Sequence, residues 1–555
     1  MSKRLKWAAG IVLGLLLLAG AAWLGREELL LSLVEFAADR RTPVGPNRAI
    51  EWSRGADPAG RAAHQRPPNI VLILADDLGW NDLSFNGGGV AGGSVPTPNI
   101  DSLARDGVNF SSGYAAHGTC APSRAAILSG RYGTRFGFEF TPTPPAMPAM
   151  VGMIAAGLPG RLRPTVQTET TGEAPAYEAL GMPAEEISLA ELLEQADYHS
   201  VHIGKWHLGR LNGMGAHDQG FDESLLMHSG LYLPEDHPDV VNSKQDFDPI
   251  DRFLWRALKF AASFNGSDAF EPAGYLTDYY TDEAVRVIEA NRDRPFFLYL
   301  AHWAPHTPLQ ATREDYEALS HIENHRLRVY AAMIRALDRG VGRVLEALRE
   351  QGLEDNTLVI FTSDNGGAHY IGVPEVNQPY RGWKITFFEG GIRVPYFMKW
   401  PAHIAAGSSF DAPVHHFDIY ATAAAAGGVP LPDDRKIDGV DLLPFAQGAR
   451  AGDPHQELFW RTGHYQVALA DGWKLQVTER PEATWLFDLN SDPTEQTNLA
   501  AREGERVAGL KARLAAHNAE QREPAWPSVG EFPVNVDKTL LDHDAPDDEY
   551  IYWPN

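Results

Sequence analysis

The sequence is almost free of cysteine, because Cys120 is the only one among 555 residues. A lone thiol has no partner within its own chain, so an intrachain disulfide is excluded. Basic side chains are also scarce: 48 lysines and arginines stand against 73 acidic residues, and the formal net charge is −25. A field of this sign repels polyanions and argues against a nucleic-acid partner. The sequence has no internal repeats, which argues against a repeat architecture.

Length and composition indicate a large globular protein. Hydrophobic residues make up 44% of the chain and charged residues 22%, which is an ordinary balance. A chain of this length can bury a large core, and we expect one large domain with a smaller one. We divide it into an N-terminal signal or anchor helix with a stalk (1–42), a linker (43–66), a main domain (67–450), an antiparallel subdomain (451–525) and a tail without a clear element (526–555).

The N-terminus carries a targeting signal. Lys3, Arg4 and Lys6 precede an apolar run over residues 7–24, whose length lies between that of a signal-peptide core and that of a spanning helix. Because the positive charges come first, the N-terminus is expected to stay inside and the following chain to cross. Either interpretation places the folded body outside the cytoplasm, in the periplasm of a bacterium.

Cleavage of the apolar run stays open. Ala19 and Ala21 permit a small-residue cleavage site, whereas Trp7 and Trp23 lie near the two ends, as in a membrane span. We favour an uncleaved anchor. Residues 27–36 have an amphipathic pattern, which predicts a stalk, a helix lying on the membrane surface or, equally well, a helix packed on the domain.

The pattern of the main domain predicts an α/β fold. Apolar runs at residues 69–75, 295–300 and 357–362 are typical of strands buried on both faces, and a long helical pattern over 327–348 precedes the third. This alternation predicts a large, mostly parallel sheet sandwiched by helices. Four short segments then predict a small antiparallel sheet: residues 457–461, 465–470, 473–477 and 485–489.

Polar residues follow the three predicted strands at their carboxyl ends, where ligands gather in such sheets. Asp76-Asp77 and Asp364-Asn365 follow the first and third strands. Each pair alone is more typical of a turn or cap, but two pairs at neighbouring strand ends indicate a cation. Oxygen-only ligands favour calcium or magnesium over zinc. His302 and His306 follow the second strand.

Four further segments carry side chains suited to chemistry. Cys120 opens the run Cys-Ala-Pro-Ser-Arg, which ends at Arg124 and suits a turn entering a helix better than a core strand. Lys205 and His207 lie two apart in Gly-Lys-Trp-His-Leu-Gly, and on an extended segment they would point to the same face. The other two segments are Ala-Pro-His-Thr-Pro-Leu around His306 and Arg-Gly-Trp-Lys ending at Lys384, followed by Arg393.

These motifs together resemble the sulfatase family, specifically the formylglycine-dependent, arylsulfatase-like enzymes of the alkaline phosphatase superfamily. The resemblance covers residues 67–500, including Asp488 to Glu495, which is similar to the closing motif of the family's C-terminal subdomain. It implies that a formylglycine-generating enzyme oxidises Cys120 to formylglycine (3-oxoalanine) before the chain folds. It also implies a calcium ion, or magnesium, held by Asp76, Asp77, Asp364, Asn365 and the modified Cys120.

The resemblance further implies roles for the remaining residues in hydrolysing a small sulfate ester. A hydroxyl of the hydrated formylglycine, deprotonated with help from Asp364, would attack sulfur, while Arg124, Lys205 and Lys384 stabilise the sulfuryl oxygens. His306 or Lys384 would then protonate the leaving alcohol, and His207 would help to release sulfate from the sulfated enzyme. The role of Arg393 stays open, and His302 is interpreted as structural. Such a cationic pocket would act locally within an acidic protein.

Two other functions stay open. Related enzymes share the formylglycine motif and the cation site, so a phosphonate monoester or phosphodiester hydrolase is the first alternative. A membrane-tethered binding protein without turnover is the second, although no expected catalytic residue is missing. The substrate depends in part on residues 136–158, where Phe138 and Phe140 either wall the pocket, favouring an aryl leaving group, or belong to a packed surface loop.

Overall fold

The computed structural model describes residue 7 and residues 25–144, 146–167 and 175–555. A nine-stranded sheet runs through the main domain in the order β13-β2-β12-β11-β1-β9-β5-β6-β8. The strands from β11 to β6 are parallel, whereas β12 and β8 pair with their inner neighbours in the antiparallel sense. The bounds are β13 (Ser408–Phe410), β2 (Val108–Phe110), β12 (Tyr396–Lys399), β11 (Thr357–Ser363), β1 (Asn69–Ala75), β9 (Phe296–Ala301), β5 (His199–Gly204), β6 (Glu223–Gly230) and β8 (Phe260–Phe264).

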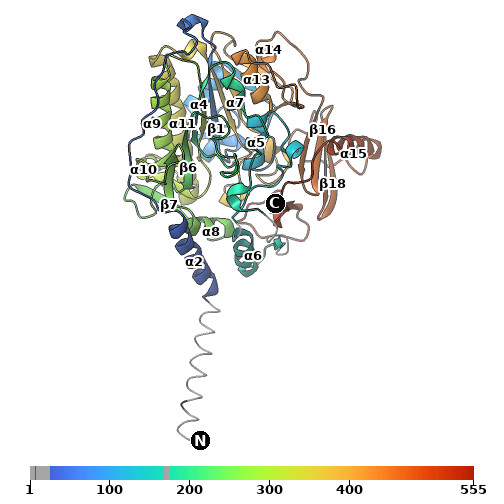
Figure 1. Ribbon diagram of the computed structural model, residues 1–555. Coiled ribbons are helices and arrows are strands. Elements are labelled where there is room, and N and C mark those ends of the chain that lie inside the picture. The colour runs from blue at the N-terminus through green and yellow to red at the C-terminus, as the bar shows by residue number, and fades with distance from the viewer. Residues whose placement is uncertain (1–6, 8–24, 145, 168–174) are drawn as a thin grey trace.

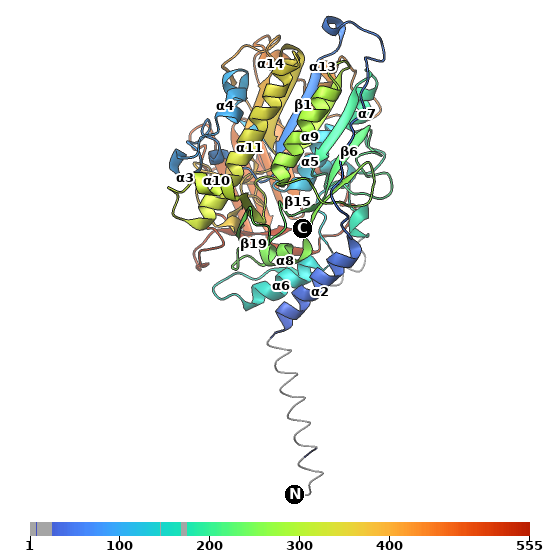
Figure 2. The same cartoon turned by 90° about the vertical axis from the view of Figure 1, so that its left-hand side faces the viewer.

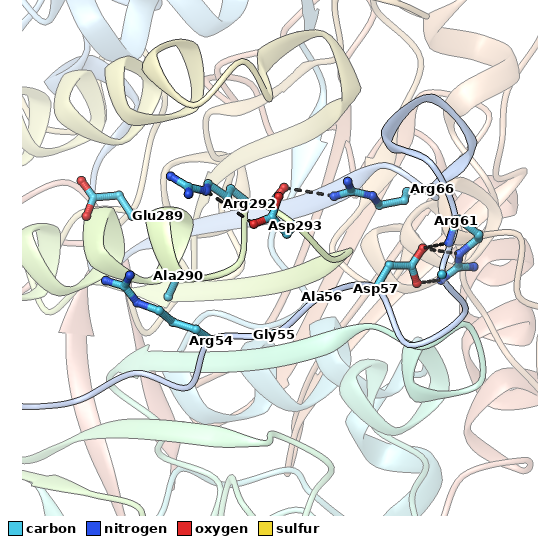
Figure 3. Close-up of a pocket in the computed structure, with 11 residues that line it drawn as sticks. Arg54, Gly55, Ala56, Asp57, Arg61, Arg66, Glu289, Ala290, Arg292 and Asp293 are labelled. Carbon is cyan, nitrogen blue, oxygen red and sulfur yellow. Dashed lines mark hydrogen bonds and ion pairs between the residues drawn. The ribbon is translucent and has the colours of Figure 1, made fainter.

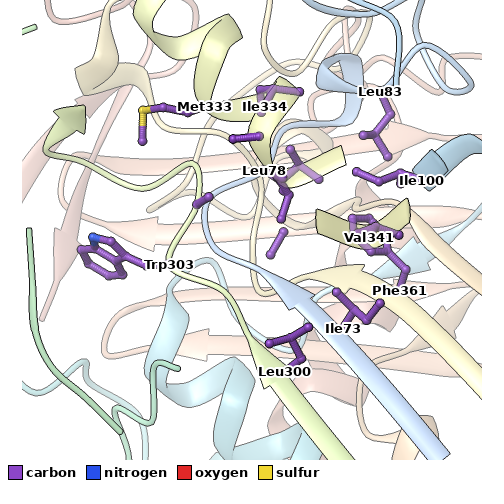
Figure 4. Packing of buried hydrophobic residues seen from close by; sticks show 14 of the residues in the cluster. Ile73, Leu78, Leu83, Ile100, Leu300, Trp303, Met333, Ile334, Val341 and Phe361 are labelled. Carbon is purple, nitrogen blue, oxygen red and sulfur yellow. The ribbon is translucent and has the colours of Figure 1, made fainter. Parts of the chain in front are cut away.

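Helices cover both faces of this sheet, as the sequence predicts (Figure 1). In β1, successive apolar side chains alternate between two hydrophobic clusters, so each face of the sheet has its own core. One cluster includes α4 (Pro98–Arg105), α9 (Leu276–Ala290) and α11 (His325–Glu350), which lie in front of the sheet in Figure 2. Figure 4 shows this packing, with Ile73 and Phe361 of the sheet facing Val341 of α11. The other cluster includes α5 (Cys120–Ser129), α7 (Leu189–Glu194) and α13 (Asp418–Gly427).

The C-terminal region forms the predicted antiparallel sheet. Its strands are β15 (Glu457–Thr462), β16 (Tyr465–Ala470), β17 (Trp473–Glu479) and β18 (Glu482–Asp488), paired in sequence order and covered by α15 (Gly504–Asn518). This sheet lies beside the main domain (Figure 1). The prediction that the tail carries no clear element is wrong: β19 (Gly530–Asn535) and β20 (Tyr550–Pro554) pair with each other, and β19 also pairs with the distant β4 (Thr165–Val166).

Three helices gather below the main domain in both views: α2 (Arg26–Arg41), α6 (Met147–Gly157) and α8 (Pro249–Ala257). Leu31 of α2, Met150 and Ile154 of α6 and Phe253 of α8 form one small hydrophobic cluster. Of the three possibilities for residues 27–36, packing on the domain is confirmed for the side of α2 that carries Leu31. Residues 136–158 also belong to the body, because Phe138 and Phe140 are buried in the core and α6 packs against α2 and α8.

The remaining short elements connect these layers. They are α3 (Val90–Gly93), α10 (Arg313–Ala318), α12 (Glu389–Ile392), α14 (Leu443–Ala446), the pair β7 (Val240–Ser243) and β10 (Leu309–Thr312), and the pair β3 (Gly113–Tyr114) and β14 (Val414–His415). The longest helix or strand within residues 43–66 is the 3-10 turn Ala63–Gln65. Even so, Ile50 and Trp52 of this segment are buried in the main core. No helix in the described part of the chain is long and apolar enough to cross a membrane. The predicted signal or anchor over residues 7–24 lies outside the described residues, apart from Trp7.

Candidate active site

The two pairs of acidic and amide side chains meet at one edge of the sheet. Because β1 and β11 are parallel neighbours with Ala75 opposite Ser363, the residues that follow them emerge side by side. All four side chains are buried. The backbone N–H of Asp77 donates to Asp364 Oδ1 at 3.2 Å, and Asn365 Nδ2 donates to Asp77 Oδ1 at 2.8 Å. The parallel sheet therefore assembles the predicted cluster.

Cys120 faces these carboxylates from the first position of α5. Its Sγ lies 3.5 Å from Asp76 Oδ1 and 3.8 Å from Asp77 Oδ1. Thr119, extended at φ −140° and ψ 157°, ends the incoming loop and turns the chain into the helix. Burial and the nearby Asp364 charge raise the pKa of the thiol, so an unmodified Cys120 would stay protonated here. A protonated thiol is a poor nucleophile.

Arg124 lies one helical turn after Cys120 and is fully buried. Its Nη2 donates to Asp76 Oδ2 at 3.0 Å and to Asp364 Oδ2 at 2.7 Å, and its Nη1 donates to the carbonyl of Lys205 at 3.0 Å. Burial alone would raise the pKa of Asp364, but Arg124 and then Lys205 outweigh it and hold that pKa below its ordinary value. Burial and the neighbouring Asp364 raise the pKa of Asp76. In this arrangement the guanidinium faces the carboxylates and positions them.

Lys205 and His207 follow β5, and the structure brings both to the same edge. Lys205 Nζ pairs with Asp76 Oδ2 at 2.7 Å and lies 4.6 Å from the centre of the Trp303 ring. The segment is not extended as expected, since His207 adopts a left-handed φ of +62°. Its Nε2 lies 3.4 Å from the carbonyl of Pro142, and its buried Nδ1 has no hydrogen-bond partner among the described residues. Burial and the charges of Lys205 and Arg124 hold the pKa of His207 well below its ordinary value.

His306 and Lys384 meet on the other side of Asp77. Lys384 Nζ lies 2.7 and 2.8 Å from the two carboxylate oxygens of Asp77, and 3.3 Å from His306 Nε2. His306 stacks on Trp303 with ring centres 3.9 Å apart, and its Nδ1 lies 2.6 Å from the carbonyl of Thr307. Burial and Lys384 lower the pKa of His306 well below its ordinary value, so the ring is neutral, with Nδ1–H donating to Thr307 and Nε2 left as an acceptor. Burial would lower the pKa of Lys384, but the charge of Asp77 outweighs burial and holds that pKa well above its ordinary value.

Tyr370 is the site residue that the sequence did not reveal. It lies in the 3-10 turn His369–Ile371, and its hydroxyl donates to Asp77 Oδ2 at 2.9 Å while accepting from Lys384 Nζ at 2.9 Å. No motif marks this tyrosine. Trp303, which contacts both Lys205 and His306, adjoins the His306 segment but was not singled out either.

The residues present fit a divalent cation. Ligand atoms of Asp76, Asp77, Cys120 and His306 all lie within 4.8 Å of one another. This set shares three members with the predicted one, adds His306 and lacks Asp364, whose carboxylate is engaged by Arg124. Asn365 Oδ1 is buried without a hydrogen-bond partner in the described part of the chain, and such an acceptor suits a hard cation.

Two other predicted residues lie apart from this cluster. Both ring nitrogens of His302 are buried without a hydrogen-bond partner among the described residues. Arg393 pairs with Glu389 at 3.2 Å, donates to the carbonyl of Ser111 and lies over Tyr380. None of these contacts is with Cys120 or with the carboxylates beside it.

A surface pocket of about 620 Å³ lies at the opposite edge of the sheet (Figure 3). The N–H of Asp57 donates to the carbonyl of Asp293, shortly before β9 begins, so this pocket adjoins the amino ends of the strands. Arg61 pairs with Asp57 at 2.8 Å. The pocket lining has four arginines against three acidic residues, and it lacks the cysteine and the neighbouring carboxylates of the Cys120 cluster.

Comparison with known proteins gives one consistent family. The family model described as Sulfatase matches residues 68–429, and the model described as N-sulphoglucosamine sulphohydrolase, C-terminal, matches residues 382–522. N-acetylgalactosamine-6-sulfatase of Mus musculus is 35% identical over 419 residues, covering 74% of this chain and 72% of the relative. Steryl-sulfatase of Mus musculus is 32% identical and covers 84% of each chain. The solved structure of Ps i-CgsB in complex with k-i-k-neocarrahexaose is 30% identical, with a TM-score of 0.67, covering 83% of this chain and 95% of that one.

Proposed function

This chain belongs to the sulfatase family of the alkaline phosphatase superfamily and is a sulfuric ester hydrolase; from this premise we propose that it works through a formylglycine at position 120. The observation that carries the proposal is the place of Cys120. Its side chain lies against Asp76 and Asp77, beside two buried lysines, a buried arginine and two half-buried histidines. Burial and the Asp364 charge raise the pKa of the unmodified thiol, which makes it a poor nucleophile and supports a modified residue 120 as the nucleophile.

The cofactors implied are the modified residue 120 and one calcium ion, with magnesium as the alternative. Asp76, Asp77, Asn365 and the modified residue 120 would hold the ion, with His306 beside them. Asp364 would contribute through Oδ1, because Arg124 engages its Oδ2. When both are in place, they supply a hydroxyl nucleophile and positive charge next to the sulfate group. Lys205 and Lys384 flank the carboxylates and supply further charge to bind and orient the sulfuryl oxygens.

The histidines divide the proton transfers. His306 is neutral with Nε2 as an acceptor, and the protonated Lys384 lies 3.3 Å from that nitrogen. Lys384 is therefore the proton source for the leaving alcohol, directly or through His306. His207 is neutral with Nε2–H donating to the carbonyl of Pro142, so its Nδ1 keeps a lone pair that can accept the proton whose loss completes turnover. Arg124 holds Asp76 and Asp364 in place.

A substitution and a mass spectrum test the nucleophile. Cys120→Ala removes it, so turnover of a sulfate ester is expected to vanish. Ser129→Ala on the same helix is the matched control, because its hydroxyl has no hydrogen-bond partner in the described part of the chain. The native peptide containing residue 120 is expected to carry an aldehyde in place of the thiol. Substantial sulfatase turnover by Cys120→Ala would contradict the mechanism, and a fully unmodified thiol in active enzyme would contradict it independently.

We further propose a carbohydrate sulfate as the substrate. The expectation of an aryl leaving group depended on Phe138 and Phe140 lining the pocket, and both are buried in the core. One relative is named an N-acetylgalactosamine-6-sulfatase, and one similar structure holds a neocarrahexaose. A steryl-sulfatase is also similar, so steroid sulfates are the second candidate. The test compares kcat/KM for a panel of carbohydrate, steroid and aryl sulfates. An aryl phosphonate monoester is included to test the alternative reaction.

The location is a separate proposal. The charges of Lys3, Arg4 and Lys6 before the apolar run support a body outside the cytoplasm, anchored by residues 7–24 or released after their cleavage. Maturation by a formylglycine-generating enzyme would then precede folding, since Cys120 is buried in the folded chain. Protease added to cells with a permeabilised outer envelope is expected to cut the protein. Protection that is lost only after lysis of the inner membrane would exclude export.

A further inference from the structure

Exposed apolar side chains are concentrated on α2. In the described part of the chain nine large hydrophobic residues are exposed, and four of them lie on this one helix: Leu29, Leu30, Leu33 and Phe36. Leu29, Leu33 and Phe36 are 56, 53 and 54% exposed and follow the spacing i, i+4 and i+7. This spacing places them on one face, so α2 presents a continuous apolar row to its surroundings. A row of this kind marks an interaction surface.

The opposite side of α2 is fixed to the body. Arg252 of α8 pairs with Glu27, and Arg256 pairs with Glu28 at 3.3 Å and Glu35 at 2.9 Å. Leu31 is 2% exposed and packs in the cluster shared with α6 and α8. Because ion pairs and core contacts already occupy this side, the helix cannot rotate to bury its apolar row. The row needs an occupant from outside.

The position of α2 in the chain identifies that occupant. Helix α2 begins at Arg26, two residues after the apolar run over residues 7–24 ends. If that run enters a bilayer, as the proposed location requires, two residues of chain reach at most about 7 Å. The first turn of α2 then lies at the membrane surface. Its 16 residues extend about 24 Å from that point.

We propose that α2 is an interfacial helix, whose row Leu29, Leu30, Leu33 and Phe36 rests on a lipid bilayer surface. Arg40 and Arg41, both exposed at the far end of the helix, suit the headgroup region, and Arg40 lies 4.6 Å over the ring of Phe36. The proposal goes beyond the sulfatase activity and rests on the proposed location. The enzyme would have a fixed orientation on the membrane, with α2, α6 and α8 on the bilayer side.

Site-specific labels in the full chain test this surface. Since Cys120 is the only cysteine, a Cys120→Ser background carries one new thiol at Leu33→Cys, labelled with bimane and reconstituted into vesicles with lipids brominated near the headgroup. Leu431→Cys is the control, because Leu431 is a 39% exposed leucine outside α2. The label at position 33 is expected to be quenched at least about threefold more than the label at 431. A third label, at Leu16→Cys at the middle of the apolar run, is read in vesicles with lipids brominated deep in the acyl chains and reports insertion of that run.

Each outcome decides. Quenching at position 16 without quenching at position 33 contradicts the proposed contact of α2 with the bilayer but supports the membrane anchor. Lack of quenching at both positions overturns the proposed location together with the surface. If the label at 33 instead responds only to mixing with other labelled chains, the row contacts a second copy and the bilayer proposal is wrong. The variant Leu29→Gln, Leu33→Gln, Phe36→Gln with Cys120 retained is expected to keep its turnover of a soluble sulfate ester. This measurement separates a failure of the surface proposal from a failure of the proposed sulfatase mechanism.

Discussion

Tyr370→Phe removes one hydroxyl from the site and keeps the ring. That hydroxyl donates to Asp77 Oδ2 and accepts from Lys384 Nζ, each at 2.9 Å, so it links a proposed metal ligand to a proposed sulfate-binding lysine. Burial first, and then the charge of Asp77, raise the pKa of Tyr370 well above its ordinary value, so the group stays a donor at neutral pH. The substitution therefore tests whether this contact positions the cluster.

The size of the effect follows from the contacts that remain. A hydrogen bond to a charged group contributes about 1.5–3 kcal/mol, and the hydroxyl makes two. The two losses do not add fully, because Lys384 and Asp77 still pair directly at 2.7 Å. We expect a loss of about 2 kcal/mol in transition-state stabilisation, which is about a 30-fold fall in kcat/KM.

Steady-state kinetics on the preferred sulfate ester, with the metal content measured in parallel, give the result. Tyr280→Phe is the matched control, since its buried hydroxyl has no hydrogen-bond partner among the described residues, and its kcat/KM should change less than about twofold. If Tyr370→Phe stays within about threefold of the native enzyme at equal metal content, the hydroxyl does not position Lys384 and Asp77, and the reasoning is refuted.

Three further predictions concern metal, stability and pH. Chelation should abolish activity, and added calcium should restore it. Asp76→Ala should lower both the metal content and the melting temperature. Elemental analysis that finds stoichiometric zinc without calcium or magnesium would contradict the proposed calcium or magnesium site. Lys474→Met should cost about 3–5 kcal/mol in thermal or urea unfolding, because the buried Glu495, 3.0 Å from Lys474, would lose its cation and the buried Glu389, at 2.8 Å, would keep only Arg393. A cost below about 1 kcal/mol would show that the two carboxylates are satisfied otherwise. Burial lowers the pKa of His302 to about 4, so the unfolded chain binds the extra proton below its own pKa of about 6.5. Stability from this group is complete above that pH and falls by about 1.4 kcal/mol per unit towards pH 4, and His302→Gln should flatten this slope; an unchanged slope would exclude His302 as its source.

Much of the fold is predictable because its signals are local. Residues 70–75 form an uninterrupted apolar run after Asn69, and β1 spans Asn69–Ala75, since a strand buried on both faces can be apolar at successive positions. The placement of Asp76 beside Asp364 follows from the same logic, because the carboxyl ends of neighbouring parallel strands share one edge.

Other features depend on long-range packing. The tail has no clear strand pattern in its sequence, yet β19 pairs with β4, which lies more than 360 residues earlier in the chain. Phe138 and Phe140 have side chains that suit a pocket wall and a core equally well, and the choice of the core is made by neighbours such as Trp526, 5.0 Å from Phe138. An apolar side chain carries no information about which apolar surface will cover it.

By itself, the sequence determined the chemical groups of this protein: a lone cysteine in the run Cys-Ala-Pro-Ser-Arg, carboxylate and amide oxygens at two strand ends, and the lysines and histidines of short segments. Only the tertiary structure decided how they face one another. It turned Arg124 onto Asp76 and Asp364, brought Tyr370 between Asp77 and Lys384, and left His306 within ligand distance of the carboxylates. The reason is physical. Residue types and their local order are written in the chain, whereas the direction of a buried side chain is set by partners that arrive from distant segments during folding.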